Sequence, residues 1–452
     1  MRFTFHPDAV TAFTAQSSEL VRAVQTRLPQ RTPGTKRFDP QVHVSAHFKE
    51  NDILGPIETS QTDRDGKTAS RFMGVGGTLF GLDEQGCSKL RKLAEAIQKA
   101  PAFRDRVSVR FLENTLFRWC VATARRAEAS SACDYVAAES EKAVERIETW
   151  VPVYGLHIQS PFAVGRVVFK TITKEMLDSL HQRILERVAV EGASGDPAIM
   201  QALERRRKEL QGFAAATVEP EAEPIRAEEI AGDLADKATS VLRFFAPANF
   251  DHRLVSYCVP LGKHQRAAHH YLFVEDGKII SASEGVSTHG LYPWVIDDAY
   301  LSDLQSAGLT AVGNLFAKHP KSILEQIAFE AILLHSKAAL VSSIPEKLLY
   351  IFAALESALL RNSNEPITQN VGERLGFLAG ADADSRIRIS KVVTEAYAVR
   401  SAFVHHGKRD EHYDPTQFMM AAWNGLHALL RNTATFTSKD ELLDAIERHK
   451  YR

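Results

Sequence analysis

The stretch Tyr397-Ala-Val-Arg-Ser-Ala-Phe-Val-His-His-Gly407 closes an amphipathic helical pattern near the C-terminal end of the chain. Hydrophobic residues recur at steps of four, three and four, the spacing of one helical face, at Val392, Ala396, Val399 and Phe403. Arg400 lies off this face. We therefore expect its side chain to be accessible rather than packed into a core.

The spacing of Arg400 and His405 constrains how the two side chains can meet. At about 100° per residue, five positions separate them by roughly 140° around an ideal helix. Both can border one pocket only if the helix ends or bends there, and Gly407 favours such an ending. A structural explanation of the pair is also open, in which the arginine pairs with an acid and the histidine assists the helix end.

The sequence around this stretch predicts an all-helical C-terminal region. Proline at the first turn and apolar residues at helical spacing indicate further helices at 323–341, 345–361, 366–379 and 415–430. Asp384 or Ser385 is expected to cap the helix that carries Arg400. The predicted class is α+β, with mixed α/β N-terminal regions followed by an all-α helical bundle.

Composition changes along the chain predict its division into segments. The run Val218-Glu-Pro-Glu-Ala-Glu-Pro224 combines two prolines with glutamates, which favours a linker or an exposed loop. Before it, strand-like runs, among them 106–110, alternate with helical stretches. The predicted segments are an N-terminal sensor or regulatory domain at 1–213, a linker at 214–230, a small mixed segment at 231–320 and a helical domain at 321–452.

Overall composition limits the classes of function. With 452 residues, 44% of them hydrophobic and 25% charged, the chain is expected to form two or three globular domains. A formal net charge of −1 argues against a protein that coats nucleic acid, but it allows a small RNA site built from local cations. No long apolar run, no secretory signal and no Cys-x-x-Cys pair occurs, which predicts no membrane and a reducing cytoplasm.

The Arg-x4-His spacing, set inside a Tyr-x-x-Arg-Ser-x-x-Val-His pattern, is similar to the motif of HEPN domains. Two upstream blocks, Leu355-Glu-Ser-Ala-Leu-Leu360 and Glu373-Arg-Leu-Gly-Phe-Leu378, together with 397–407, resemble successive helices of the ApeA-like HEPN family. The resemblance covers roughly residues 321–452. His406 stands where the family more typically has glycine, so His405 and His406 are both candidates for the acid/base group.

The resemblance implies a homodimer, because HEPN domains typically pair with their motifs facing each other across a two-fold axis and form one composite cleft. Glu356 resembles a family position that faces this cleft, where it would orient an arginine or a histidine. Tyr397 could hydrogen-bond to a base or stack on it, but a packed tyrosine fits equally well. Ser401 belongs to the same motif and, with His406, completes the candidate supporting residues.

The chemistry of RNA suits this residue pair. RNA carries its own nucleophile, the 2′-hydroxyl, so its cleavage needs a base for that proton and a donor for the phosphate oxygens. His405 can accept or donate a proton near neutral pH, and Arg400 offers a planar fork of donors to a phosphate. The expected products are a 2′,3′-cyclic phosphate and a 5′-hydroxyl, with no divalent metal and no cofactor.

The family's members are implicated in abortive infection and in cleavage of transfer RNA. The resemblance therefore implies a cytoplasmic antiphage endoribonuclease that acts on RNA, with transfer RNA as the candidate target. Its activity would be toxic to its own cell, so we expect the N-terminal region to restrain it until a phage-derived trigger arrives.

Two other classes of function remain open. In the first, the helical domain is a catalytically silent dimerisation or RNA-binding module, and the N-terminal part carries the function. In the second, Cys258 joins His264, His269 and His270 in a metal site, although their spacing matches no known ligand pattern. We expect no metal.

Overall fold

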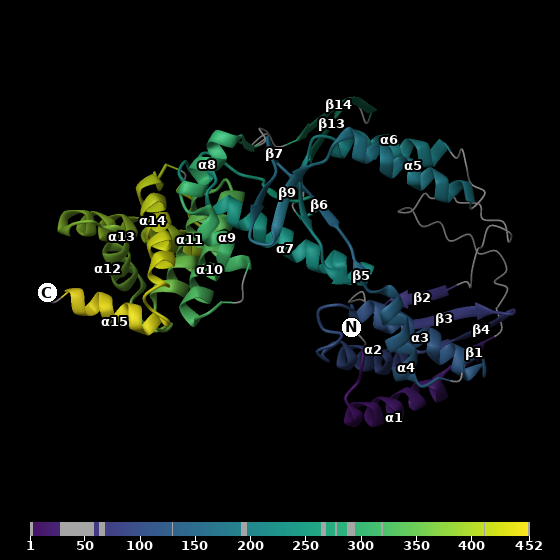
Figure 1. Ribbon diagram of the computed structural model, residues 1–452. Coiled ribbons are helices and arrows are strands. Elements are labelled where there is room, and N and C mark those ends of the chain that lie inside the picture. The colour runs from purple at the N-terminus through teal and green to yellow at the C-terminus, as the bar shows by residue number, and fades with distance from the viewer. Residues whose placement is uncertain are drawn as a thin grey trace. The chain divides into compact units, whose positions relative to one another are not determined.

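The computed structural model describes residues 3–27, 58–62, 68–128, 130–190, 197–263, 268–275, 278–286, 294–317, 320–410 and 412–450. The chain divides into two compact units, each of which combines helices and strands (Figure 1). The first unit comprises Met1–Glu148 and Glu219–Ile230, and the second comprises Thr149–Val218 and Ala231–Arg452. The predicted α+β class with a helical C-terminal region is confirmed.

The first unit is built on an antiparallel sheet whose described strands follow the order β1-β4-β3-β2. These strands are β1 (Gln25–Arg27), β2 (Glu58–Thr62), β3 (Thr68–Val75) and β4 (Thr78–Leu82). The helices of this unit are α1 (Pro7–Ala23), α2 (Glu84–Gln98), α3 (Val109–Ala124) and α4 (Ala132–Ala143). Helix α2 packs on β3 and α1 contacts the other three helices, so Leu93, Leu116 and Phe117 share one core.

Helix α3 begins at a serine cap, Ser108. The hydroxyl of Ser108 accepts the backbone N–H of Phe111, which satisfies a donor that the first helical turn leaves without a partner. The strand predicted at 106–110 is therefore wrong. Valines at alternate positions follow the period of a strand, but Val107 is buried before the cap and the helix begins at Val109.

Residues 214–230, predicted as a linker or an exposed loop, form regular structure over most of their length. Strand β10 (Ala214–Val218) is buried in the sheet of the second unit. Strand β11 (Glu221–Ala222) pairs with β5 (Glu145–Arg146), and α7 (Pro224–Phe244) follows directly. The linker prediction is wrong.

Glu223 explains why a run of glutamate and proline is ordered here. Its buried carboxylate accepts backbone N–H groups from Ser108 at 3.0 Å and from Ile225 and Arg226 at 2.8 Å each. The last two donors lie in the first turn of α7, where N–H groups have no partner within the helix. A single glutamate thus joins the starts of α3 and α7, and Pro224 occupies the first helical position, which tolerates proline.

The second unit contains a sheet in the order β12-β6-β10-β9-β8, with every neighbouring pair antiparallel. The strands beside β10 are β6 (Thr149–Tyr154), β8 (Phe162–Val164), β9 (Val167–Thr171) and β12 (Val259–Pro260). In the centre, Ala216 pairs with Val151 on one side and with Phe169 on the other. Ala238 and Leu242 of α7 bury their side chains in the same core.

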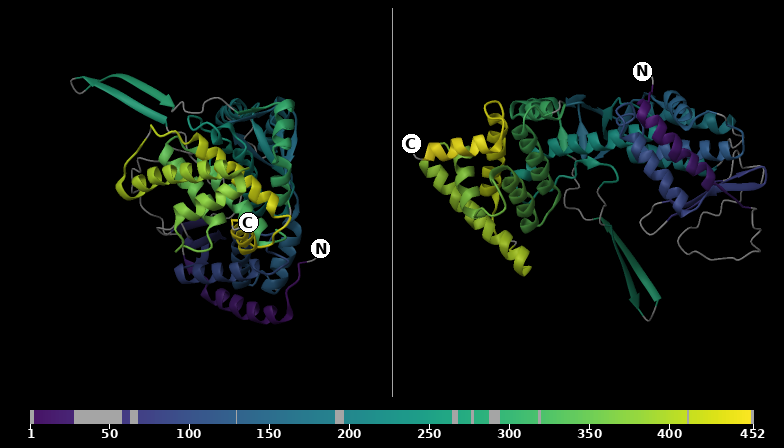
Figure 2. Two further views of the ribbon diagram at one scale, coloured as in Figure 1. Left: turned by 90° about the vertical axis from the view of Figure 1, so that its left-hand side faces the viewer. Right: turned by 90° about the horizontal axis from the view of Figure 1, so that it is seen from below.

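Further elements of the second unit connect the sheet to the C-terminal helices. Helices α5 (Lys174–Val190) and α6 (Pro197–Leu210) lie side by side in the ribbon (Figure 1). Strands β13 (Ala268–Glu275) and β14 (Lys278–Val286) form an antiparallel hairpin (Figure 2). The remaining elements are β7 (Leu156–Ile158) with its parallel partner β15 (Trp294–Ile296), η2 (Pro247–Asn249), α8 (Asp298–Ser306) and α9 (Leu309–Ala317).

The C-terminal helices pack on the rest of the second unit. They are α10 (Ile323–His335), η3 (Ser336–Leu340), α11 (Ile344–Leu359), α12 (Ile367–Ala379), α13 (Ala383–His406), α14 (Thr416–Asn432) and α15 (Lys439–Lys450). One hydrophobic core runs from Phe169 in the sheet through Leu242 to Leu355 and Leu426. The structure therefore has no domain division at the predicted position 320. No helix within the described ranges has both the length and the apolar character needed to cross a membrane.

Candidate active site on helix α13

Helix α13 carries the predicted site and is held by its neighbours α11, α12 and α14. Its N-terminal cap is Asp382, which accepts the N–H of Ser385 while the Ser385 hydroxyl accepts the N–H of Asp382. The expected cap at Asp384 or Ser385 is thus displaced by two or three residues. On the predicted apolar face Ala396 is fully buried, whereas Val399 is half-buried.

Arg400 points toward α11. Its Nη2 atom lies 3.7 Å from Oε1 of Glu356, and its side chain keeps 20% of its surface exposed. Its guanidinium carbon also lies 5.6 Å from the centre of the Tyr397 ring. Arg400 is therefore only partly accessible, not freely exposed as expected.

The carboxylate of Glu356 is poorly satisfied. Its side chain is 24% exposed, and burial raises its pKa while the charge of Arg400 opposes the rise. Among the described residues, neither Oε1 of Glu356 nor Nε of Arg400 has a hydrogen-bond partner. A buried polar atom without a partner is uncommon in a native structure. Arg400 therefore keeps donor capacity that the acceptor oxygens of a phosphate could use, whereas the free Glu356 acceptor would need a donor such as a hydroxyl group.

Both candidate histidines are exposed. The ring centres of His405 and His406 lie 6.4 Å apart, and no described residue forms a hydrogen bond or ion pair with either ring. Each imidazole is thus free to meet a substrate or a second protein chain.

Helix α13 ends after the motif, not within it. It is helical through His406 and stops at Gly407, which adopts a left-handed conformation with φ of 63°. The N–H of Gly407 donates to the carbonyl oxygen of Phe403 at 2.9 Å. The expected end at Gly407 is found, but no bend separates Arg400 from His405. The two side chains therefore leave the same regular helix in directions roughly 140° apart.

The supporting candidates have different surroundings. Tyr397 packs edge-on against Phe352 of α11, with ring centres 5.5 Å apart, so a structural role accounts for much of its placement. Ser401 is half-buried beside Arg400. Arg409, two positions after Gly407, places its Nη2 atom 3.9 Å from a carboxylate oxygen of Glu346.

The alternative metal site gains no support from the described residues. Cys258 is completely buried, and burial raises the pKa of its thiol to about 12, which disfavours the thiolate that binds zinc. His264 and the side chains of His269 and His270 lie outside the described residues. Within the part of the chain that is described, no three His, Cys, Asp or Glu residues gather closely enough to share a metal ion. All four cysteines are buried and free.

Comparisons of the chain with protein-family models, with curated proteins and with solved structures gave no match.

Proposed function

We propose that this protein is a metal-independent HEPN endoribonuclease that acts in the cytoplasm during antiphage abortive infection. The observation that carries the proposal is the environment of Arg400. The guanidinium lies 3.7 Å from the Glu356 carboxylate without a hydrogen bond to it, on the helix whose last turn carries the exposed His405. A cation used only for stability would be expected to pair fully with its acid.

Each residue has a role that its surroundings support. His405 or His406, exposed to solvent, takes the proton of the ribose 2′-hydroxyl or returns one to the 5′-oxygen of the leaving nucleotide. Arg400 binds the phosphate oxygens that gain negative charge in the transition state. Glu356 holds the guanidinium in place from the other side. The substrate is RNA, with transfer RNA as the candidate.

A homodimer would bring the two groups together. Since Arg400 faces α11 and His405 leaves the helix about 140° away, one chain does not direct both at one phosphate. A two-fold axis near the end of α13 would place the His405 of a second copy opposite Arg400. The face of α13 that carries His405 supports such an approach, because its exposed residues Thr394 and Ala398 are small.

The N-terminal regions would restrain the enzyme and respond to a phage-derived trigger. An unrestrained ribonuclease would destroy the RNA of its own cell. The N-terminal regions are the candidates for this regulation because the candidate site lies in the C-terminal helices.

The decisive experiment compares growth and total RNA in cells that express the wild type, Arg400→Ala or His405→Ala, with and without phage. Arg388→Ala is a matched control, because Arg388 is an exposed arginine on the same helix. We expect RNA fragments with cyclic phosphate ends in challenged wild-type and Arg388→Ala cells, and none in the other two. Intact RNA with persistent phage protection in all variants would instead assign the function to the N-terminal part.

A further inference from the structure

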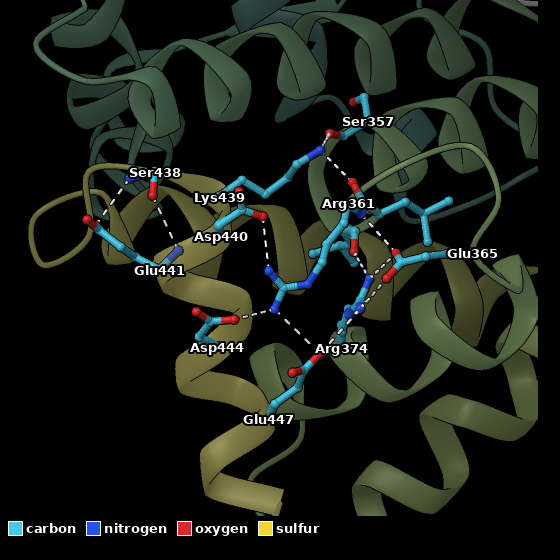
Figure 3. Close-up of polar contacts among 12 residues, drawn as sticks. Ser357, Arg361, Glu365, Arg374, Ser438, Lys439, Asp440, Glu441, Asp444 and Glu447 are labelled. Carbon is cyan, nitrogen blue, oxygen red and sulfur yellow. Dashed lines mark hydrogen bonds and ion pairs between the residues drawn. The ribbon is translucent and has the colours of Figure 1, made fainter.

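The end of helix α11 is fixed by two cations from other helices. The last carbonyl groups of an α-helix have no partner within the helix and need one elsewhere. Lys439, the first residue of α15, donates from its Nζ atom to the carbonyl oxygens of Ser357 and Leu360 (Figure 3). Arg374 of α12 donates to the carbonyl oxygen of Leu359 at 2.6 Å. Positive charges at this position also suit the negative end of the helix dipole.

A network of carboxylates keeps these cations in place. Arg374 donates to both carboxylate oxygens of Glu365, at 2.6 and 2.8 Å (Figure 3). Arg361, just beyond α11, contacts three acids of α15, namely Asp440, Asp444 and Glu447. Helix α15 is therefore bound to α11 and α12 through several polar contacts at once.

Lys439 connects by hydrogen bonds to the candidate active site. The N–H of Leu360, whose carbonyl oxygen receives Lys439, donates to the carbonyl oxygen of Glu356 at 3.0 Å. The Glu356 side chain has no hydrogen bond to Arg400, so their 3.7 Å separation depends on where the backbone of α11 places Glu356. Whatever fixes the last turn of α11 therefore also fixes this acid.

We infer that Lys439 is a positioning residue for Glu356: by holding the last turn of α11, it keeps the Glu356 carboxylate opposite Arg400. Its effect on RNA cleavage rests on the proposed function. Leu442 and Leu443 bury their side chains in the core. Helix α15 therefore stays docked when the Lys439 amine alone is removed, and the end of α11 loses its two hydrogen bonds.

The chain offers a matched control on the same helix. Lys450, at the other end of α15, pairs with Glu373 of α12 at 2.6 Å, so it links α15 to α12. Lys450→Met removes one lysine of α15, as Lys439→Met does. Only Lys439→Met removes the hydrogen bonds from Lys439 to the last turn of α11, which carries Glu356.

The test measures steady-state cleavage of a short RNA by the full-length wild type, Lys439→Met, Lys439→Arg and Lys450→Met. A displacement of Glu356 should lower kcat by about tenfold with little change in KM in Lys439→Met. Lys450→Met should match the wild type, and Lys439→Arg should recover most of the rate, since arginine can also donate to two carbonyl groups. Equal losses in Lys439→Met and Lys450→Met would overturn the inference.

A double-mutant cycle with Glu356→Gln tests whether Lys439 affects the cleavage rate through Glu356. If Lys439 acts through Glu356, the Lys439→Met change should cost much less in the Glu356→Gln background than in the wild type. Independent, additive losses would overturn the inference.

Hydrogen exchange separates this inference from the proposed function, because it needs no activity. We expect the amides of residues 356–361 to exchange at least about tenfold faster in Lys439→Met than in Lys450→Met. If no variant cleaves RNA, the proposed function fails, and exchange alone decides whether Lys439 holds the Glu356 turn. Equal exchange in the two variants would show that it does not.

Discussion

The imidazole of His335 meets the ring of Phe244 edge to face, with ring centres 5.4 Å apart. His335 is fully buried, and neither ring nitrogen has a hydrogen-bond partner among the described residues. Burial and the nearby charge of Lys347 lower its pKa to about 3. The fold therefore holds a neutral histidine in its core.

This burial predicts a loss of stability in acid. Below the pKa of about 6.5 for an unperturbed histidine, the unfolded chain binds a proton at His335 that the folded chain does not bind. The free energy of unfolding should fall by about 2 kcal/mol between pH 6.5 and pH 5 from this residue alone. Urea unfolding of the wild type and of His335→Leu at both pH values should show a smaller change in the free energy of unfolding with pH in the variant. An equal slope in both proteins would contradict the burial.

The ion pairs of Arg374 should contribute more to the free energy of unfolding than those of Arg361. Arg374 is 6% exposed and bonds both Glu365 and the end of α11, so Arg374→Met removes the donor to the Leu359 carbonyl group and leaves the Glu365 carboxylate with only the backbone N–H of Arg361. We expect a loss of about 2–4 kcal/mol in the free energy of unfolding. Arg361→Met should cost less than about 1 kcal/mol, because its partners Asp440, Asp444 and Glu447 are 71%, 54% and 52% exposed. Chemical unfolding of both variants measures these two losses. A larger loss in Arg361→Met than in Arg374→Met would contradict the prediction.

Glu223 should stabilise the first unit. Glu223→Ala removes an acceptor shared by three backbone N–H groups at two helix starts, which should cost about 2–3 kcal/mol. Glu221→Ala is the control, because the Glu221 side chain is 61% exposed and pairs with Arg106 rather than with the start of a helix. Limited proteolysis should cut the first unit faster in Glu223→Ala alone. Similar cleavage of both variants would argue against the cap.

The composite cleft can be tested by mixing inactive chains. Arg400→Ala and His405→Ala should each be inactive, but a dimer with one chain of each keeps one Arg400 and one His405 on opposite chains. If the site uses residues of both chains, co-expression and purification through two tags should yield a dimer with a substantial part of the wild-type cleavage rate. A heterodimer without activity would contradict a cleft shared in this way.

Cleavage should not need a divalent metal. The proposed chemistry uses only protein side chains and the 2′-hydroxyl of the substrate. Excess EDTA should leave the rate unchanged, while a substrate with a 2′-deoxy nucleotide at the cleavage site should resist. Loss of activity in EDTA that zinc or magnesium restores would favour a metalloenzyme instead.

Local sequence signals predicted the C-terminal helices well. Proline at a first turn located the starts of α11 and α12 to within one residue, and Gly407 marked the end of α13. Helix α15 was not predicted, because its buried apolar residues are only Leu442 and Leu443 and most of its other residues are charged. Contacts with distant residues such as Arg361 hold it in place, and no local pattern encodes them.

Long-range contacts also explain the two wrong predictions in the first half of the chain. The Glu-Pro run around Glu223 is ordered because residue 108 lies next to it in space, more than one hundred positions earlier in sequence. The sequence proposed Arg400, His405 and Glu356 for the candidate site, and the structure brings Arg400 and Glu356 together. The separation of Arg400 and Glu356, and the role of Lys439 behind them, depend on how four helices pack.

The four buried cysteines give the chain its own reporters of unfolding. Burial raises the pKa of each thiol, so little thiolate exists at neutral pH in the native state. Cys87, Cys120 and Cys133 lie in the first unit, and Cys258 lies in the second. An alkylating reagent should label each unit only when that unit opens. Mass spectrometry of the labelled peptides could then follow the opening of each unit separately, without any engineered probe.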